Sequence, residues 1–222
     1  MQRKIIETGD GSKTLFIAEM DEQYHSVNGA ITESEFVYLN NGFRHNQAPN
    51  PIVLEIGFGT GLNALLTAIE AEKTHRKTTY ITLEKFPVKP EEIQQLNYGS
   101  LISEQAEKIY SALHKKEWNL KSKISPYFDI LKLKTDLTQF DFNDIPTVDV
   151  VYFDAFGPDK QPEMWDEEIF RKLFSISNQN ANLVTYSAKG EIRRRMERSG
   201  YISERLPGPP GKRQMLRATR PE

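Results

Sequence analysis

"LEIGFGTGLN", from Leu54 to Asn63, is the stretch that decides the fold. It opens on the end of a short apolar run, "IVLEI", whose β-branched residues predict a buried strand. Glycines then follow at every second position, and because glycine lets a ligand approach the backbone closely, Gly57, Gly59 and Gly61 indicate a binding loop. The apolar residues after the loop recur at helical spacing, which predicts a helix. They are Leu62, Leu65, Leu66 and Ile69.

Strand-like and helix-like segments alternate from this point onward. This alternation predicts an α/β fold with a doubly wound, mostly parallel sheet, closed by an antiparallel hairpin around "PGPPGK". Asp166 is expected to cap the helix that runs to Ile176, and Gly200 to end the next helix. We expect residues 49–222 to form this domain and residues 1–48 to be an N-terminal appendage to it. The strands are expected at 52–56, 78–84, 127–135, 148–156 and 181–188.

Composition excludes several classes of site. The sequence holds no cysteine, which rules out disulfides, thiolate zinc sites, iron–sulfur clusters and cysteine nucleophiles. Its four histidines lack metal-ligand spacing, so we expect no metal. No apolar run is long enough for a membrane span or a signal peptide, and we therefore expect a cytoplasmic protein without membrane contact.

Charge is distributed unevenly along the sequence. From Lys189 to Glu222 there are ten basic and four acidic residues, a net charge of +6. The other 188 residues carry 19 basic and 27 acidic residues, a net charge of −8. Such asymmetry is typical of a basic patch that binds a polyanion. A solvated helix face followed by a basic tail would give the same count, so the sequence leaves both interpretations open.

An acid stands two positions before the first glycine of the loop. The pattern Glu55-x-Gly57-x-Gly59-x-Gly61 fits neither the dinucleotide fingerprint nor the triphosphate-binding P-loop. An acid beside the loop suits a cationic ligand and would repel a pyrophosphate. The spacing resembles motif I of class I S-adenosylmethionine-dependent methyltransferases, whose cofactor carries a sulfonium and an ammonium but no phosphate. The resemblance implies a Rossmann-like fold.

Two further acids follow the next two expected strands. Glu84 ends the second strand, where a carboxylate can accept both hydrogen bonds of a ribose diol. Asp136 follows the third strand, and the methyltransferase resemblance implies a contact with the adenine amino group. Together with the loop, these acids predict a site for S-adenosylmethionine. Its expected residues are Glu55, Gly57, Gly59, Gly61, Asn63, Glu84, Lys85 and Asp136.

The string "DAFGPDKQPEMW", Asp154 to Trp165, narrows the family. With "LEKFP" (83–87), it resembles the methyltransferase half of the bifunctional enzyme that completes the 5-methylaminomethyl group on the wobble uridine of tRNA. The resemblance covers roughly residues 8–218 and departs mildly at Gly157 and Gln214. The other half of that enzyme, a flavin-dependent oxidase, has no counterpart in this sequence, so we expect no FAD. Other matching motifs are "YHSVNGAITES", "TYSAKGEIRRRMERSGY" and "GPPGKRQML".

The resemblance implies methyl transfer to an aminomethyl uridine that is made elsewhere, and it leaves open a separate FAD-dependent oxidase as a partner. Asp154 is expected to orient the amine and take up its proton. Phe156 is expected to stack on the uracil, with simple packing under the loop as the alternative. Tyr186 is expected either to line the pocket or to pack in the core. The expected contacts to phosphates of the anticodon stem-loop are Lys212 and Arg213, with Lys189 and one or two of Arg193, Arg194 and Arg195.

Two conspicuous residues in family-like motifs are interpreted as structural. Trp165 opens a helical segment, so packing is favoured over a substrate contact. His25 is expected to make a structural hydrogen bond, with a contact to the substrate as the alternative.

Two rival functions fit parts of the sequence. Polyamine aminopropyltransferases share the expected fold and also bring an amine to a sulfonium, but the Arg-rich C-terminal third argues against a cationic polyamine. A non-catalytic module that binds S-adenosylmethionine or RNA is the second rival. An intact Asp154 and an intact "GFGTG" loop argue against it.

Overall fold

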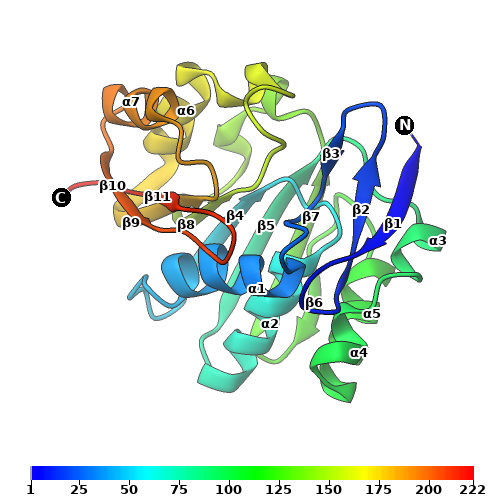
Figure 1. Ribbon diagram of the computed structural model, residues 1–222. Coiled ribbons are helices and arrows are strands. Elements are labelled where there is room, and N and C mark those ends of the chain that lie inside the picture. Colours follow the sequence, from blue (N-terminus) through cyan, green and yellow to red (C-terminus); the bar gives the residue numbers. More distant parts are fainter. Residues whose placement is uncertain (1) are drawn as a thin grey trace.

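A single eight-stranded sheet organises the molecule (Figure 1). The structure is a computed structural model that describes residues 2–222. The sheet runs in the order β10-β11-β9-β8-β4-β5-β7-β6, and its five central strands are parallel, which confirms the predicted doubly wound α/β fold. The parallel strands are β4 (Ile52–Ile56), β5 (Thr78–Glu84), β7 (Phe128–Lys134), β8 (Val148–Phe153) and β9 (Ser177–Thr185). The antiparallel strands are β6 (Ser122–Ser125), β10 (Ile202–Pro207) and β11 (Gln214–Thr219), and the last two form the predicted hairpin.

The sheet reverses its winding at β4. From β4 the chain proceeds outward to β5 and β7 on one side, and later to β8 and β9 on the other. In a doubly wound sheet a ligand binds outside the carboxyl ends of the strands at such a reversal. The glycine loop that follows β4 therefore lies at the expected place for a cofactor.

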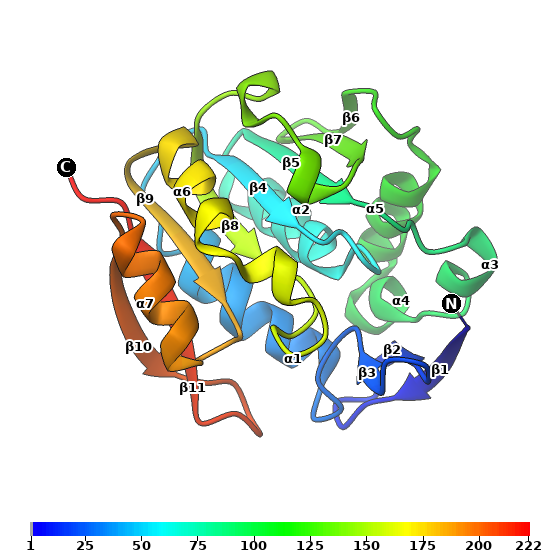
Figure 2. The same cartoon turned by 90° about the horizontal axis from the view of Figure 1, so that it is seen from above.

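Helices cover both faces of the sheet (Figure 2). Because successive residues of a strand point to opposite faces, Val53 belongs to one apolar core and Leu54 to the other. The first core includes Leu62 and Leu65 of the predicted helix, and the second includes Phe170. One face carries α2 (Leu62–Thr74) and α5 (Glu104–Lys115), with the short α3 (Pro90–Ile93) and α4 (Tyr98–Ile102) nearby, and the other carries α6 (Glu167–Ile176) and α7 (Gly190–Arg198).

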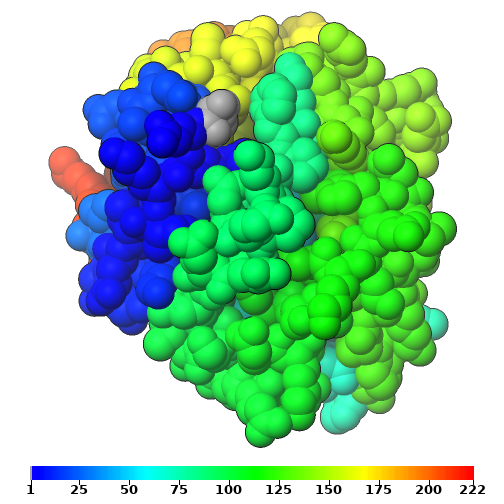
Figure 3. Space-filling view, turned by 90° about the vertical axis from the view of Figure 1, so that its right-hand side faces the viewer, coloured from blue at the N-terminus to red at the C-terminus, as the bar shows by residue number. Residues whose placement is uncertain are grey.

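The N-terminal segment forms its own small sheet. On the molecular surface, its blue atoms lie against the green atoms of the region that holds α3 to α5 (Figure 3). The segment is tied to α3 by an ion pair between Arg3 Nη1 and Glu92 Oε2 at 3.0 Å. A helical stretch then crosses the first core, where Val37 and Phe43 are fully buried. The elements are β1 (Arg3–Glu7), β2 (Lys13–Ile17), β3 (Glu22–Gln23), α1 (Ala30–Ser34) and the π-helix Glu35–Phe43.

Three details differ from the sequence-based expectation. The edge strand β6 was not predicted, and β9 begins four residues earlier than expected. Gly42 lies one residue before the end of the π-helix at Phe43; a side chain at position 42 would meet the ring of Tyr152, which explains the glycine by packing. Asp166 stands at the N-cap of α6, but its side chain makes no capping hydrogen bond and instead faces Arg195 at 3.5 Å. Among residues 2–222, no helix is long and apolar enough to cross a membrane.

Candidate active site

A cavity of about 510 Å³ opens at the carboxyl ends of β4, β5, β7 and β8. Its walls include the glycine loop, the loop after β8 and the tip of the β10–β11 hairpin. One whole side is built by residues 22–28, so the N-terminal segment expected as an appendage is part of the cavity wall. The volume is within the range of small-molecule and cofactor sites.

The glycine loop is held by close backbone packing. Gly57 has φ +91°, and a Cβ there would lie 2.7 Å from the carbonyl oxygen of Asp154. Gly59 has φ +50° and faces the ring of Tyr24, which fills the space next to it. From below, Tyr110 Oη donates to the carbonyl oxygen of Thr60 at 2.9 Å. The loop is thus fixed from both sides by neighbouring elements.

The two acids at the ends of β5 and β7 lie where the sequence places them. Glu84 accepts hydrogen bonds from the backbone N–H of Gly59 at 3.0 Å and of Phe86 at 2.7 Å. Asp136 accepts from the ammonium of Lys85 at 2.7 Å, and this bond lowers the pKa of Asp136. Both acids line the cavity, as does Lys85. They are available to the hydroxyl and amino groups of a nucleoside, which is the donor set of an adenosine cofactor.

Glu55 lies in a different position from the one expected. Its side chain is fully buried beneath the loop and is not part of the cavity wall. Thr82, Asn63 and Tyr80 surround it, and burial raises the pKa of Glu55 well above its usual range. Because the side chain is buried outside the cavity wall, a direct cofactor contact of Glu55 has no support in this geometry.

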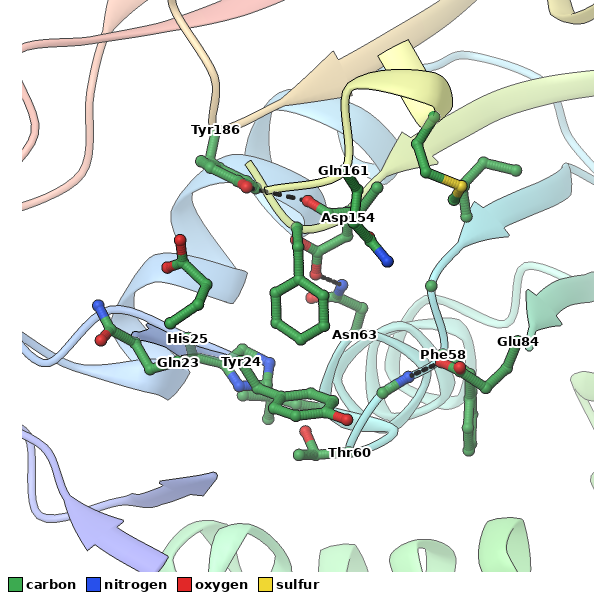
Figure 4. A pocket seen from close by; sticks show the side chains of 18 of the residues that line it. Gln23, Tyr24, His25, Phe58, Thr60, Asn63, Glu84, Asp154, Gln161 and Tyr186 are labelled. Atoms are coloured by element: carbon green, nitrogen blue, oxygen red, sulfur yellow. Dashed lines mark hydrogen bonds between the residues drawn. The ribbon is translucent and has the colours of Figure 1, made fainter. Parts of the chain in front are cut away.

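Asp154 projects into the middle of the cavity (Figure 4). Its backbone N–H donates to the carbonyl of Ile56, which places it beside the glycine loop. Tyr38 Oη donates to Asp154 Oδ1 at 2.5 Å, and Asn63 Nδ2 donates to Asp154 Oδ2 at 2.8 Å. Burial raises the pKa of Asp154 to about 7, although the hydrogen bond from Tyr38 lowers it. A carboxyl group of this kind can hold or release a proton near neutral pH.

Two of these contacts refine the sequence-based assignment. Asn63, predicted as a cofactor ligand, lines the cavity, but its amide N–H donates a hydrogen bond to Asp154. Tyr38 was missed, because its π-helix reaches Asp154 only through the packing of the folded chain. The string "ESEFVYLNNGF" gives no local signal of that approach.

Aromatic side chains line the cavity beyond Asp154. Phe156 and Tyr24 meet edge to face, with ring centroids 5.1 Å apart. Tyr186 lines the cavity and donates from its Oη to the carbonyl of Ala155 at 2.9 Å. Trp165 is fully buried and donates to the carbonyl of Phe156 at 2.8 Å, which confirms that it is structural and supports the loop that carries Phe156.

His25 makes the structural hydrogen bond expected of it. Its Nδ1 lies 3.1 Å from Thr14 Oγ1, and burial lowers the pKa of His25 to about 4. The ring is therefore neutral at physiological pH. It also forms part of the cavity wall.

Most cations of the basic C-terminal third pair with acids, which its charge count does not indicate. Seven of its ten cations face acids, and these pairs reduce the positive charge that this part of the surface presents. The acids come from α1, α6, α7, β10 and the loop after β8. Those within α7 are three or four residues away in the sequence, whereas the fold brings the others close. Arg205 and Arg213 have no acidic partner within residues 2–222, and Arg213 lies outside the cavity wall. The paired arginines include Arg193, Arg194 and Arg195, and Lys189 pairs with Asp159.

Lys212 lies in the cavity wall and not on the outer surface. Its Nζ is 2.5 Å from Glu33 Oε1 and 4.1 Å from the centre of the Tyr186 ring. Within residues 2–222, no group of three or more acidic or histidine side chains gathers as a metal ion would need.

The reversal at β4, the glycine loop and the acids after β5 and β7 together define a class I methyltransferase fold. A family model described as S-adenosyl-L-methionine-dependent methyltransferase matches residues 90–221. The chain belongs to this family, and its cofactor is S-adenosylmethionine. The cavity fits that cofactor, since it joins a glycine loop to two acids at successive strand ends.

Several relatives and solved structures are similar to the chain. The tRNA 5-methylaminomethyl-2-thiouridine biosynthesis bifunctional protein MnmC of Hydrogenovibrio crunogenus is 28% identical over 94% of this chain and 32% of its own length. The protein of the same name from Leptospira interrogans is 30% identical over 89% of this chain and 32% of its own length. The chain thus spans about a third of the length of these relatives.

Two solved structures share the fold. MNMC2 from Aquifex aeolicus superposes with a TM-score of 0.78 at 23% identity, over 98% of this chain and 70% of that one. Spermidine synthase from Thermotoga maritima superposes with a TM-score of 0.54 at 13% identity, over 99% of this chain and 72% of that one. The fold is therefore shared with a spermidine synthase as well, and by itself it does not select a function.

Proposed function

We propose that the protein transfers a methyl group from S-adenosylmethionine to the aminomethyl nitrogen of the wobble uridine in tRNA. The observation that carries the proposal is Asp154, a cavity carboxylate beside the glycine loop, held by Tyr38 and Asn63. The names of the relatives and the extent of the alignment support the substrate, since the similarity covers 89–94% of this chain.

Asp154 would act on the amine. S-adenosylmethionine, when bound, supplies an electrophilic methyl group on a sulfonium. A free primary ammonium has a pKa near 10, so the amine must lose a proton before its nitrogen can bond to the methyl carbon. Asp154 would accept the proton that the primary ammonium gives up first. The neutral amine would then form the N–C bond as the C–S bond breaks, so that sulfur leaves as the thioether of S-adenosylhomocysteine and the nitrogen becomes a secondary ammonium. The hydrogen bonds of Asp154 to Tyr38 and Asn63 fix the carboxylate for this purpose.

The aromatic wall would hold the base. Phe156 is half-buried and lines the cavity together with Tyr24 and Tyr186. Bases of single-stranded loops are commonly held on such aromatic faces once they leave the stack. An extruded uracil stacked on Phe156 would bring its 5-substituent toward Asp154, two residues away.

Polyamine transfer is the alternative that the shared fold raises. The cavity charge does not decide against it, because Lys212 pairs with Glu33 and six acids line the cavity. The similarity to the tRNA-modifying relatives over 89–94% of this chain favours tRNA. Phosphates of the anticodon stem-loop would instead contact Arg205 and Arg213, beside the cavity. The protein would act in the cytoplasm, and an FAD-dependent oxidase activity would supply the aminomethyl group.

Incubation with labelled S-adenosylmethionine and bulk tRNA, followed by nucleoside analysis, tests the proposal. We expect label only in 5-methylaminomethyl uridine derivatives. The Asp154→Asn variant is the control for contaminating methyltransferases. Label in another nucleoside, or label in a polyamine added in parallel, would overturn the substrate assignment.

A further inference from the structure

Segments from opposite ends of the chain meet at one side of the cavity. Gly211, in the β10–β11 loop, has no room for a side chain because the amide of Asn28 occupies that space. The next residue, Lys212, pairs with Glu33 of α1. Glu33 is itself buried and accepts from the backbone N–H of Ser26 at 2.7 Å. The lysine is thus held in place by a fixed carboxylate.

Lys212 is also joined to the loop that carries the reacting carboxylate. Its Nζ lies over the ring of Tyr186, and Tyr186 Oη donates to the carbonyl of Ala155, the residue after Asp154. Lys212, Tyr186 and Asp154 line the same cavity. An ammonium has three N–H donors, and the ion pair with Glu33 engages a single carboxylate oxygen. The lysine can therefore still donate to a ligand that Asp154 also contacts.

We propose that Lys212 donates a hydrogen bond to the O4 carbonyl of the uracil whose aminomethyl group reaches Asp154. This inference rests on the proposed function. In a 5-substituted pyrimidine, C4 is bonded to C5, so O4 faces the wall next to Asp154 when the amine lies against that carboxylate. Uracil presents an acceptor at this position, whereas cytosine presents an amino donor. Lys212 is then a specificity-determining residue that selects uracil, and Glu33 is its positioning residue.

The same donor could serve two other acceptor oxygens. These are the carboxylate of S-adenosylmethionine and a phosphate of the RNA backbone. Removing the Lys212 ammonium has a different effect for each of the three acceptors, and the experiment is designed to distinguish these effects.

The test compares Lys212→Met with Lys115→Met, which removes the same charge from an exposed position at the end of α5. The substrates are anticodon stem-loops that carry 5-aminomethyluridine or 5-aminomethylcytidine. For Lys212→Met we expect kcat/KM on the uridine substrate to fall at least about tenfold, as for removal of a charge-assisted hydrogen bond. The preference of Lys212→Met for uridine over cytidine should fall as well, whereas its affinity for S-adenosylhomocysteine should match that of wild type. The control Lys115→Met should match wild type in kcat/KM, in base preference and in affinity for S-adenosylhomocysteine.

Three results would overturn the assignment to O4. Weaker binding of S-adenosylhomocysteine would assign Lys212 to the cofactor carboxylate, and a weaker salt dependence of RNA binding would assign it to a phosphate. An unchanged preference for uridine would exclude base reading. The wild-type rate on the uridine substrate reports separately on the proposed function. An inactive wild type would overturn that function and this inference with it, whereas an active wild type with an unchanged preference overturns only the role of Lys212.

Discussion

At the scale of the residue, the chemistry depends on the environment of Asp154. The carboxylate is withdrawn from water, which raises its pKa to about 7, and Glu33 raises it further through charge repulsion. Tyr38 and Asn63 oppose this change by donating to the carboxylate. An ordinary exposed aspartate would be too weak a base to take a proton from an amine at neutral pH. Burial makes Asp154 a better acceptor.

The first prediction concerns the pH dependence of activity. Only the ionised form of Asp154 can accept the proton, so kcat/KM should rise with pH through a midpoint near the pKa of about 7. In Asp154→Asn this inflection should disappear and turnover should fall about 10²–10⁴-fold. Initial rates between about pH 5 and 9 measure both effects. S-adenosylhomocysteine should bind the variant normally; near-normal turnover in the variant would remove Asp154 from the mechanism.

The second prediction concerns stability. The pKa of Asp154 is about 7 in the folded protein and about 4 in an unfolded chain, so the folded state binds more protons between these values. Stability that Asp154 contributes below about pH 4 is therefore lost as the pH rises through 7. Because Asn cannot ionise, Asp154→Asn should be more stable than wild type above pH 7, by on the order of 1–3 kcal/mol.

Thermal unfolding at acidic and alkaline pH measures this difference. The two proteins should differ least at low pH and most at high pH. A variant that is less stable than wild type at every pH would show that the hydrogen bonds to Tyr38 and Asn63 outweigh the cost of burying the charge.

At the scale of the element, the glycine loop joins three strands. Gly57 donates to the carbonyl of Leu83 on β5 at 3.0 Å and packs against the carbonyl of Asp154 after β8. His114 and Tyr110 of α5 hold the carbonyl of Thr60 from below. The loop can therefore place a cofactor relative to Asp154 only if its backbone keeps this path.

The third prediction is that Gly57→Ala abolishes or strongly weakens binding of S-adenosylhomocysteine. A Cβ at this position would lie 2.7 Å from a backbone oxygen, at a φ of +91° that disfavours alanine. Gly11→Ala is the matched control, because Gly11 also has positive φ, +79°, but nothing lies within 4 Å of its Cβ. Both variants should lose roughly 1 kcal/mol of stability from the backbone conformation, but only Gly57→Ala should lose the ligand.

Isothermal titration calorimetry on both variants checks this prediction. Equal affinities of the two variants for S-adenosylhomocysteine would mean that the loop tolerates the backbone shift that a Cβ at position 57 requires. The close packing at Gly57 would then have no bearing on the cofactor.

The sequence predicted the five parallel strands because β4 and β8 are mostly apolar, β5 is rich in β-branched residues, and β7 and the second half of β9 carry recurring apolar residues. It missed β6, "SKIS", since a short edge strand has no such pattern. It also predicted Glu84, Asp136 and Asp154, because the carboxyl ends of parallel strands meet at one edge of the sheet. Tyr38 could not be predicted, since 116 residues separate it from Asp154 and only the packing of its helix across the sheet brings them together.

At the scale of the whole molecule, the N-terminal segment and the β10–β11 hairpin complete the cavity between them. The contacts of Gly211 with Asn28 and of Lys212 with Glu33 join the two. The charge count along the sequence did not show that seven of the ten C-terminal cations would face acids, five of them with acids of other elements. The proposed contact with RNA phosphates is therefore limited to Arg205 and Arg213, on the hairpin that borders the cavity.

The fourth prediction is that Arg205→Ala combined with Arg213→Ala weakens tRNA binding regardless of sequence. It should also flatten the dependence of log affinity on log salt, by roughly 1 for each phosphate that the variant no longer neutralises. Arg171→Ala, which removes an exposed cation on α6 that pairs with Glu167, should leave the slope unchanged. Coinciding slopes for the double variant and wild type would place the RNA backbone elsewhere on the surface.

Methylation of an aminomethyl nitrogen on a tRNA uridine is the central activity proposed for this cavity. A synthetic anticodon stem-loop with 5-aminomethyluridine at the wobble position, incubated with S-adenosylmethionine and the protein, tests it most directly by mass spectrometry of the product. We expect one added methyl group on the aminomethyl nitrogen, none on a stem-loop with unmodified uridine, and none on spermidine or putrescine. Methylation of the unmodified stem-loop, or transfer to a polyamine in place of the aminomethyl uridine, would contradict this activity.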